Sequence, residues 1–162
     1  MRFTEKQRFN QLWLWIPLVL ISLLPLWGVV QQVIMDKPFG NNPMSNTGLI
    51  IFLIVMLMFL YFIGTLELRT QIDSESIRVR FWPFGSKTIP WNDIESAEVL
   101  NYGFVGGWGL RIGTKYGTVY NTSGKMGLAL KLKNGRKLCI GTQRPSELSE
   151  VTIQILEGGL DE

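Results

Sequence analysis

Two long uncharged runs dominate the hydrophobic pattern of the first 66 residues. Residues 12–30 (LWLWIPLVLISLLPLWGVV) and 48–66 (GLIIFLIVMLMFLYFIGTL) each extend for 19 residues without a charged side chain. A helix of that length measures about 28 Å, which is close to the thickness of the hydrocarbon core of a bilayer. Neither run has the polar residues at helical spacing that a buried helix of a globular protein shows. We therefore expect two transmembrane helices, at residues 12–30 and 48–66.

Basic residues that flank these runs predict their orientation. Arg2, Lys6 and Arg8 precede the first run, as in a cleaved signal sequence, but no small-residue cleavage site follows it. The connecting loop, residues 31–47, carries one lysine, whereas four basic residues follow the second run. Because basic residues favour the cytoplasmic side, we expect cytoplasmic N- and C-termini and an extracytoplasmic loop. Since the runs contain no charged group, they are typical of an anchor and not of an ion path.

From residue 65 the hydrophobic pattern changes to alternation with a period of two. TLELRTQI (65–72) and SIRVRFW (76–82) are joined by the turn-forming cluster DSES (73–76), which predicts a hairpin. A four-residue connection lets the two apolar faces coincide. The pairs that follow are Ile72 with Ile77, Thr70 with Val79, and Leu68 with Phe81.

A second hairpin is predicted in GLALKLKNGRKLCIGT (127–142). A two-residue turn at Asn134-Gly135 would place the flanking leucines on opposite faces of the sheet. A three-residue loop, with Gly135 left-handed, instead aligns them and turns Cys139 away from the apolar face, where it fills space. The expected pairs are Leu130 with Leu138 and Leu128 with Ile140.

The remaining pattern completes a mainly-β unit. Residues 87–100 are expected to form one bent strand, followed by strands at 109–113 and 117–122. Pro145 suits the first position of a helix, and an apolar stripe follows it at helical spacing. The expected fold is a seven-stranded antiparallel roll or barrel, capped by one C-terminal helix. It covers residues 67–157, directly after the second predicted transmembrane helix. Residues 1–11 are expected to form a cytoplasmic N-terminal tail, and residues 158–162 a C-terminal tail.

Composition excludes several kinds of chemistry. The chain has one cysteine and no histidine, which argues against disulfide scaffolds, zinc sites and histidine-based acid–base catalysis. Asp93, Glu95 and Glu98 are the nearest approach to a carboxylate cluster, but they fall where a strand bends. We therefore expect no enzymatic activity, no cofactor and no metal.

Three strings carry a resemblance to a known family. IPWNDIESAEV, YGFVGGWGLRIG and VYNTSGKMGLALKLKNGRKLCIGTQRP resemble the bacterial pleckstrin-homology-like (PH-like) family of small membrane proteins, over about residues 66–157. The resemblance implies a PH-like fold in the bacterial inner membrane, and some members are implicated in envelope stress or in immunity to antimicrobial peptides. Fold analogy assigns neither a reaction nor a ligand. Phosphoinositide binding is not carried over, because the first loop, residues 73–76, is acidic.

The glycine-rich stretch at residues 101–127 is a candidate nucleotide-binding loop, but its spacing argues against that role. Gly107-x-Gly109 is followed by Ile112 where a dinucleotide fingerprint requires a third glycine. Gly124-Lys125 is followed by methionine where a phosphate loop requires serine or threonine. The glycines fall at the ends of expected strands, where a small barrel bends. We interpret the stretch as structural.

Charge and expected topology together suggest two surfaces. Eight basic and no acidic residues lie between Val99 and Ser146, a bias that a solvated face explains equally well. In an up-and-down meander, the turns at 81–86, 114–117 and 133–137 would meet at the membrane end, where aromatic and basic side chains suit an anionic interface. The predicted lipid-facing residues are Trp82, Phe84, Lys115, Tyr116, Lys133, Arg136 and Lys137. The predicted partner-binding residues at the opposite end are Tyr102, Phe104 and Trp108, which are equally consistent with core positions.

These observations predict a membrane-anchored interaction or scaffold module. It would dock on the inner leaflet, contact anionic phospholipid headgroups and bind a protein or peptide partner. The alternative is a self-assembling homo-oligomer that acts in envelope stress or in immunity to antimicrobial peptides. Nucleic acid is not an expected partner, because much of the net charge of +3 belongs to the N-terminal tail, where topology explains it.

Overall fold

A computed structural model describes residues 2–158. The chain divides into two compact units. One unit is Asn10–Thr65, and the other combines the residues up to Phe9 with the residues from Leu66 onward. Of the predicted C-terminal tail, residues 159–162 lie outside the described residues.

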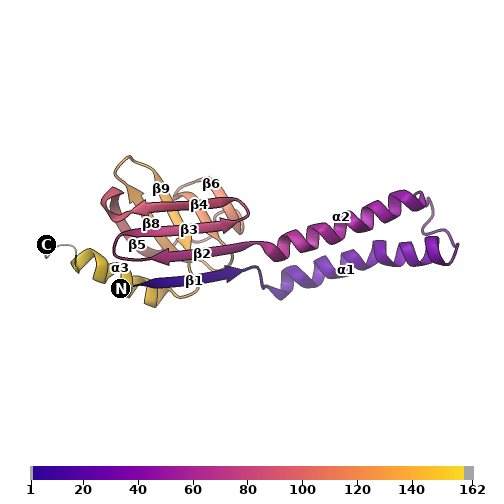
Figure 1. The fold of residues 1–162 in the computed structure, drawn as a ribbon, viewed down its shortest axis with the longest axis horizontal. Coiled ribbons are helices and arrows are strands. Elements are labelled where there is room, and N and C mark those ends of the chain that lie inside the picture. Colours follow the sequence, from indigo (N-terminus) through magenta and orange to yellow (C-terminus); the bar gives the residue numbers. More distant parts are fainter. Residues whose placement is uncertain (1, 159–162) are drawn as a thin grey trace. The chain divides into compact units, whose positions relative to one another are not determined.

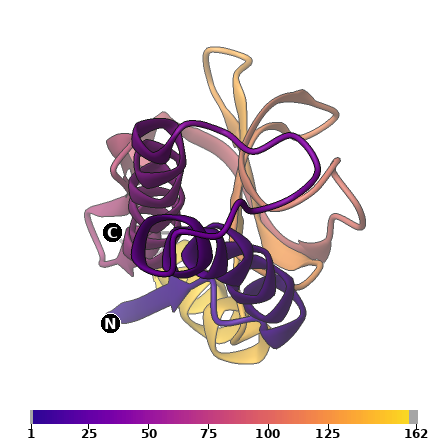
Figure 2. The ribbon, with the colours of Figure 1, turned by 90° about the vertical axis from the view of Figure 1, so that its right-hand side faces the viewer.

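The first unit is a pair of apolar helices. Helix α1 (Leu12–Val29) continues into a short π-helical segment, η1 (Val30–Ile34), and α2 (Asn46–Thr65) follows a loop. The two helices lie side by side (Figure 2). The helical segments Leu12–Ile34 and Asn46–Thr65 are both long and apolar enough to cross a membrane. The two predicted helices are thus present, with boundaries shifted by a few residues.

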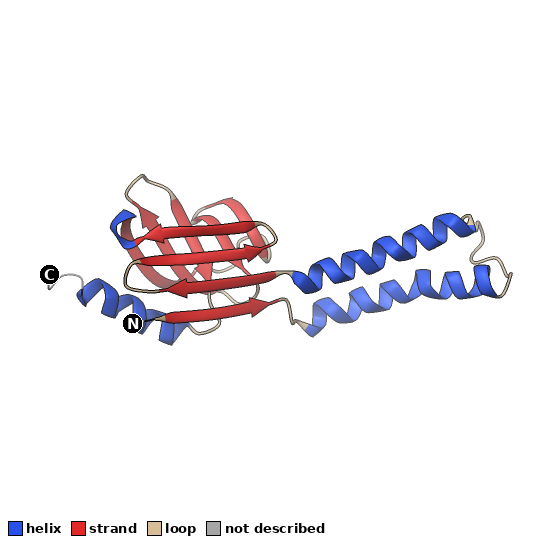
Figure 3. Ribbon diagram, viewed as in Figure 1, coloured by secondary structure: helices blue, strands red, loops and turns tan. Residues whose placement is uncertain are grey.

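The second unit contains two β-sheets and one helix (Figures 1 and 3). The four-stranded sheet has the order β1-β2-β3-β4, and the five-stranded sheet has the order β5-β8-β9-β7-β6. The strands are β1 (Phe3–Arg8), β2 (Glu67–Ile72), β3 (Ser76–Trp82), β4 (Gly85–Pro90), β5 (Ile94–Asn101), β6 (Gly109–Thr114), β7 (Gly117–Asn121), β8 (Met126–Leu132) and β9 (Lys137–Gly141). Helix α3 is Pro145–Gly158.

The fold is mainly β, as expected, but the described residues contain nine strands instead of seven. The predicted tail at 1–11 contributes β1, which pairs with β2. The bent strand predicted at 87–100 is divided by a 3₁₀ turn, η2 (Trp91–Asp93), so that its halves belong to different sheets. In addition, β7 and β9 are parallel, so the sheets do not form a simple meander.

Both predicted hairpin registers are confirmed. Strands β2 and β3 pair Ile72 with Ile77, Thr70 with Val79 and Leu68 with Phe81. Strands β8 and β9 pair Leu130 with Leu138 and Leu128 with Ile140. Gly135 has a φ of 80°, which is the left-handed conformation that the three-residue loop requires. Apolar residues at alternate positions therefore set both registers, because any one-residue slip would expose them.

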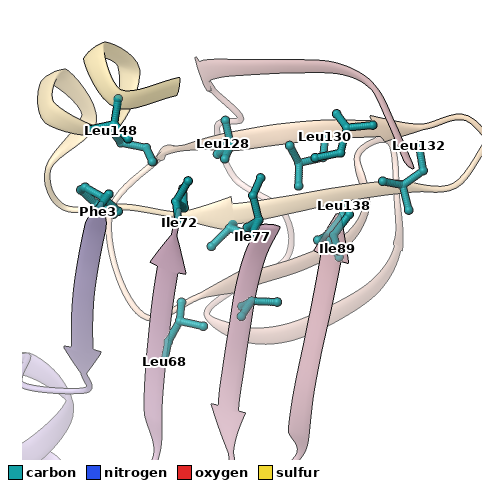
Figure 4. Packing of buried hydrophobic residues seen from close by; sticks show 14 of the residues in the cluster. Phe3, Leu68, Ile72, Ile77, Ile89, Leu128, Leu130, Leu132, Leu138 and Leu148 are labelled. Atoms are coloured by element: carbon teal, nitrogen blue, oxygen red, sulfur yellow. The ribbon is translucent and has the colours of Figure 1, made fainter. Parts of the chain in front are cut away.

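The core lies between the two sheets and is closed by α3 (Figure 4). The four-stranded sheet contributes buried residues that alternate with exposed ones, as on β3. The five-stranded sheet contributes alternate residues of β8 and β9, two strands that are buried over most of their length. The predicted stripe on α3 supplies Leu148 and Val151, and Thr152 is buried beside them. Figure 4 shows Phe3, Leu68, Ile72, Ile77 and Ile89 facing Leu128, Leu130, Leu132, Leu138 and Leu148.

A second, smaller cluster covers the other face of the five-stranded sheet. It consists of Tyr102, Val119 and Cys139, all almost fully buried. Gly127 makes room for this cluster, since a Cβ there would lie 2.9 Å from the Tyr102 ring and 2.7 Å from the Ile140 carbonyl oxygen. The glycine-rich stretch thus has the structural role predicted for it, because Tyr102 anchors it on the sheet.

Candidate anionic-ligand surface on the four-stranded sheet

A row of three basic side chains crosses the exposed face of the four-stranded sheet. Lys6 on β1 is paired with Arg69 on β2, and Arg69 is paired with Arg80 on β3. All three side chains are exposed, because they alternate with the inward-facing core residues of their strands. Like charges directly opposite each other destabilise a sheet, so this row has a cost that an anionic ligand would offset.

Glu67 is the acidic residue in the midst of this surface. Its carboxylate lies 3.0 Å from the Lys6 ammonium, 3.0 Å from the Arg8 guanidinium and 3.1 Å from the Arg69 guanidinium. Burial alone would raise the pKa of Glu67, but hydrogen bonds from these three cations together lower the pKa below its ordinary value. Four cations, counting Arg80, against one carboxylate leave three positive charges.

Arg80 differs from its neighbours in the row. Within the part of the chain that the structure describes, its guanidinium forms no ion pair with a carboxylate. It lies over the Trp82 ring instead, 5.3 Å from the centroid. Glu67, Arg69, Arg80 and Trp82 line a cavity of about 200 Å³. The cavity therefore offers a guanidinium whose charge is not already neutralised.

Two aromatic rings near the end of β3 are exposed, and one of them, Trp82, lines this cavity. Trp82 ends β3 and is 49% exposed, while Phe84 in the β3–β4 turn is 57% exposed. The Phe84 ring stacks on the buried Phe81 ring, with centroids 5.4 Å apart, so one of its faces covers the core. Half-exposed aromatic rings next to arginines are typical of side chains at a membrane–water interface.

The basic and aromatic residues of this surface lie near the ends of β1 and β3 and the start of β2. At the end of β1 the chain continues into α1, and at the start of β2 it returns from α2. Arg8, the last residue of β1, is paired with Glu67, the first of β2, and Glu67 is paired with Trp82. Leu66 alone separates β2 from α2, and three residues separate β1 from α1. One residue spans at most about 3.6 Å and three span about 11 Å, so both connections are short.

The structure does not bring the seven predicted lipid-facing residues together. Trp82 and Phe84 lie at the end of β3 just described. Lys133, in the β8–β9 turn, donates its backbone N–H to the Asp93 carbonyl oxygen at 2.9 Å. The neighbouring Trp91 indole donates to the Asp73 carbonyl oxygen at 2.8 Å, which places this turn at the opposite end of β3. Arg136 occupies the same turn as Lys133.

The other three predicted residues lie at the same end of the five-stranded sheet as the β8–β9 turn, because β7 and β9 run parallel and Lys137 directly follows Arg136. The Lys115 ammonium lies 4.8 Å from the centroid of the Tyr116 ring. Both residues line a cavity of about 230 Å³ with Lys137. The expected single surface requires one bent strand that runs from one end of the roll to the other. The division of that strand at η2 instead starts β5, and with it the β8–β9 turn, at the end where β4 finishes, away from Trp82 and Phe84.

The three predicted partner-binding residues also separate. Tyr102 is 2% exposed, and its hydroxyl donates to the Gly124 carbonyl oxygen at 3.3 Å. Burial raises the pKa of this phenol. Phe104 is 80% exposed and Trp108 is 38% exposed. Tyr102 is therefore a core residue, and the other two remain accessible to a partner.

Sequence reasoning missed the basic row, although part of its signal was present. The predicted pairing of Thr70 with Val79 already places Arg69 opposite Arg80. Lys6 was assigned to a tail, because the inward positions of β1 include the polar residues Glu5 and Gln7, and the strand lacks an apolar alternation. The basic N-terminus was explained by membrane topology alone.

Comparisons with models of known protein families and with curated proteins gave no match for this chain. The resemblance to PH-like membrane proteins therefore stays a prediction.

Proposed function

We propose that this protein is a membrane-anchored interaction module whose β unit docks on an anionic lipid surface. Helices α1 and α2 would cross the membrane, and the docking surface would comprise Lys6, Arg8, Arg69, Arg80, Trp82 and Phe84. The proposal includes a PH-like fold and a bacterial inner membrane with both termini cytoplasmic, as the sequence resemblance and the flanking charges suggest.

The observation that carries the proposal is the position of the basic and aromatic side chains. They gather at the strand ends that continue, within one and three residues, into the two apolar helices. If α2 spans the membrane, a connection of one residue keeps the start of β2 at the interface. Exposed Trp and Phe rings and a surplus of cations are the side chains that an anionic interface stabilises.

The size of the electrostatic attraction to the membrane indicates what docking would do. Each basic residue near an anionic leaflet contributes about 1 kcal/mol, so a surplus of three charges contributes about 3 kcal/mol. Two membrane-spanning helices already make insertion effectively irreversible. Docking would therefore orient the β unit and not recruit it. The accessible Phe104 and Trp108 rings would then be available to a protein or peptide partner.

Spin labelling of the full chain in vesicles tests the docking. Ser86, exposed and paired with Arg80, is replaced by Cys and labelled, and Lys133→Cys provides a control at the opposite end of β3. The native Cys139 is buried and stays unlabelled. In vesicles with anionic lipid we expect the label at 86 to be accessible to dissolved oxygen at headgroup depth and the label at 133 to be in water. Equal exposure of both labels to an aqueous relaxation agent would refute docking.

A further inference from the structure

We infer that Arg80 and Arg69, flanked by Trp82, hold one phosphate group in the cavity of about 200 Å³ that they line with Glu67. The inference deepens the proposed docking and rests on it for the source of the phosphate, which would be the headgroup of an anionic phospholipid. The site lies entirely within the β unit, on adjacent strands whose pairing sets Arg69 opposite Arg80.

Arg80 is suited to be the principal ligand. Its guanidinium carbon lies over the Trp82 ring, 5.3 Å from the ring centroid. A cation–π contact does not use the N–H donors of a guanidinium that lies flat on the ring, so they would be able to bind a ligand. Among the described residues no carboxylate pairs with it. A planar fork of N–H donors binds a tetrahedral phosphate with two parallel hydrogen bonds, which a single ammonium group cannot do.

Arg69 is the second ligand of the phosphate, and Glu67 reduces but does not cancel the positive charge around the cavity. Arg69 shares the carboxylate of Glu67 with Lys6 and Arg8, at 3.0–3.1 Å. This carboxylate would repel an anion if it were alone, but three cations already contact it. The balance around the cavity is still positive, so a phosphate between Arg69 and Arg80 would relieve the repulsion between the two guanidinium groups.

Arg78 provides a matched control for Arg80. It lies on the same strand and the same exposed face, two residues away. Its guanidinium is 3.6 Å from the Asp73 carboxylate, and Arg78 does not line the cavity. Arg78→Gln and Arg80→Gln therefore remove the same charge from one face of one strand, with only the second change affecting the proposed site.

Native mass spectrometry of the full chain in a neutral detergent tests the site. Phosphatidylglycerol and phosphatidylcholine are added in equal amounts, and the bound lipid is counted. We expect one retained phosphatidylglycerol in the wild-type chain and in Arg78→Gln. We expect about tenfold weaker binding in Arg80→Gln, because the variant loses the charge-assisted hydrogen bonds of the guanidinium. Arg80→Lys keeps the positive charge but loses the planar set of N–H donors, so its affinity for phosphatidylglycerol should lie between those of the wild-type chain and Arg80→Gln.

Unchanged lipid binding in Arg80→Gln, or an equal loss in Arg78→Gln, would overturn the site. A parallel titration with inorganic phosphate against chloride, at constant ionic strength, distinguishes the source. Thermal stabilisation by phosphate that depends on Arg80, without retained phosphatidylglycerol, would support the phosphate site and overturn the lipid headgroup as its source.

The lipid-binding experiment tests the phosphate site independently of docking, because a detergent micelle has no membrane leaflet on which the β unit could dock. Lipid binding that depends on Arg80, combined with a label at 86 that stays in water in vesicles, would leave the site standing and refute docking. A label at headgroup depth, combined with no Arg80-dependent binding of either the lipid or inorganic phosphate, would leave docking standing and refute the site.

Discussion

The carboxylate of Glu5 accepts a 2.7 Å hydrogen bond from the hydroxyl of Thr142, a residue 137 positions later in the chain. Its other oxygen accepts a 2.8 Å hydrogen bond from the backbone N–H of Gln143. Gln7 extends the same arrangement, since its amide donates to the Gly141 carbonyl oxygen at 2.8 Å. Inward-facing polar side chains of β1 thus attach the N-terminal strand to the end of β9.

This arrangement predicts that Glu5→Ala destabilises the folded chain. The substitution leaves the Thr142 hydroxyl and the Gln143 N–H without their acceptor in a site where Glu5 is only 5% exposed. A buried polar group left without a partner costs about 1–3 kcal/mol. Thermal unfolding of the full chain in neutral detergent should show this loss. Thr4→Ala, an exposed neighbour on β1, should change the stability by less than about 0.5 kcal/mol; equal effects of the two substitutions would contradict the prediction.

The cation cluster around Glu67 predicts a pH dependence of stability. The pKa of Glu67 in the folded chain is below its ordinary value of 4.5. Its contribution to stability is therefore complete above about pH 4.5 and is lost as the pH falls through the lower, folded-state pKa. The melting temperature of the wild-type chain should fall more steeply in that window than that of Glu67→Gln. Parallel curves for the two chains would show that the cluster does not stabilise the fold.

Tyr102 and Phe104 should respond differently to truncation. Tyr102 fills the space between Gly127 and Gly141, so Tyr102→Ala leaves a cavity and should cost about 3–5 kcal/mol. Phe104→Ala should leave the melting temperature nearly unchanged, because the Phe104 ring is 80% exposed. If Phe104→Ala destabilised the chain as much as Tyr102→Ala, Phe104 would be a core residue and not part of a partner surface.

Cys139 should be inert in the folded chain. Its thiol is fully buried, and burial raises its pKa to about 12, so little thiolate is present at neutral pH. Incubation with iodoacetamide at pH 8 should leave the native mass unchanged, whereas the chain unfolded in denaturant should gain one carbamidomethyl group. Modification of the native chain at the rate of the unfolded chain would mean that this part of the sheet opens readily.

Three kinds of element were predictable from local sequence. The transmembrane-length helices follow from the absence of charge over 19 residues. The hairpins at 67–82 and 126–141 follow from alternation, because only one register buries all of the apolar residues on one face. The stripe on α3 follows in the same way from helical periodicity.

The two apolar helices, the hairpin registers and α3 therefore follow from local sequence, since each depends on residues close together in the chain. The place of β1 in the β unit follows from long-range contacts, because its inward-facing Glu5 and Gln7 have their hydrogen-bond partners more than 100 residues away. That strand completes the basic row by placing Lys6 beside Arg69. The division of the predicted bent strand at η2 separates Lys133 and Arg136 from Trp82, because β5, which pairs with β8, begins at the end where β4 finishes.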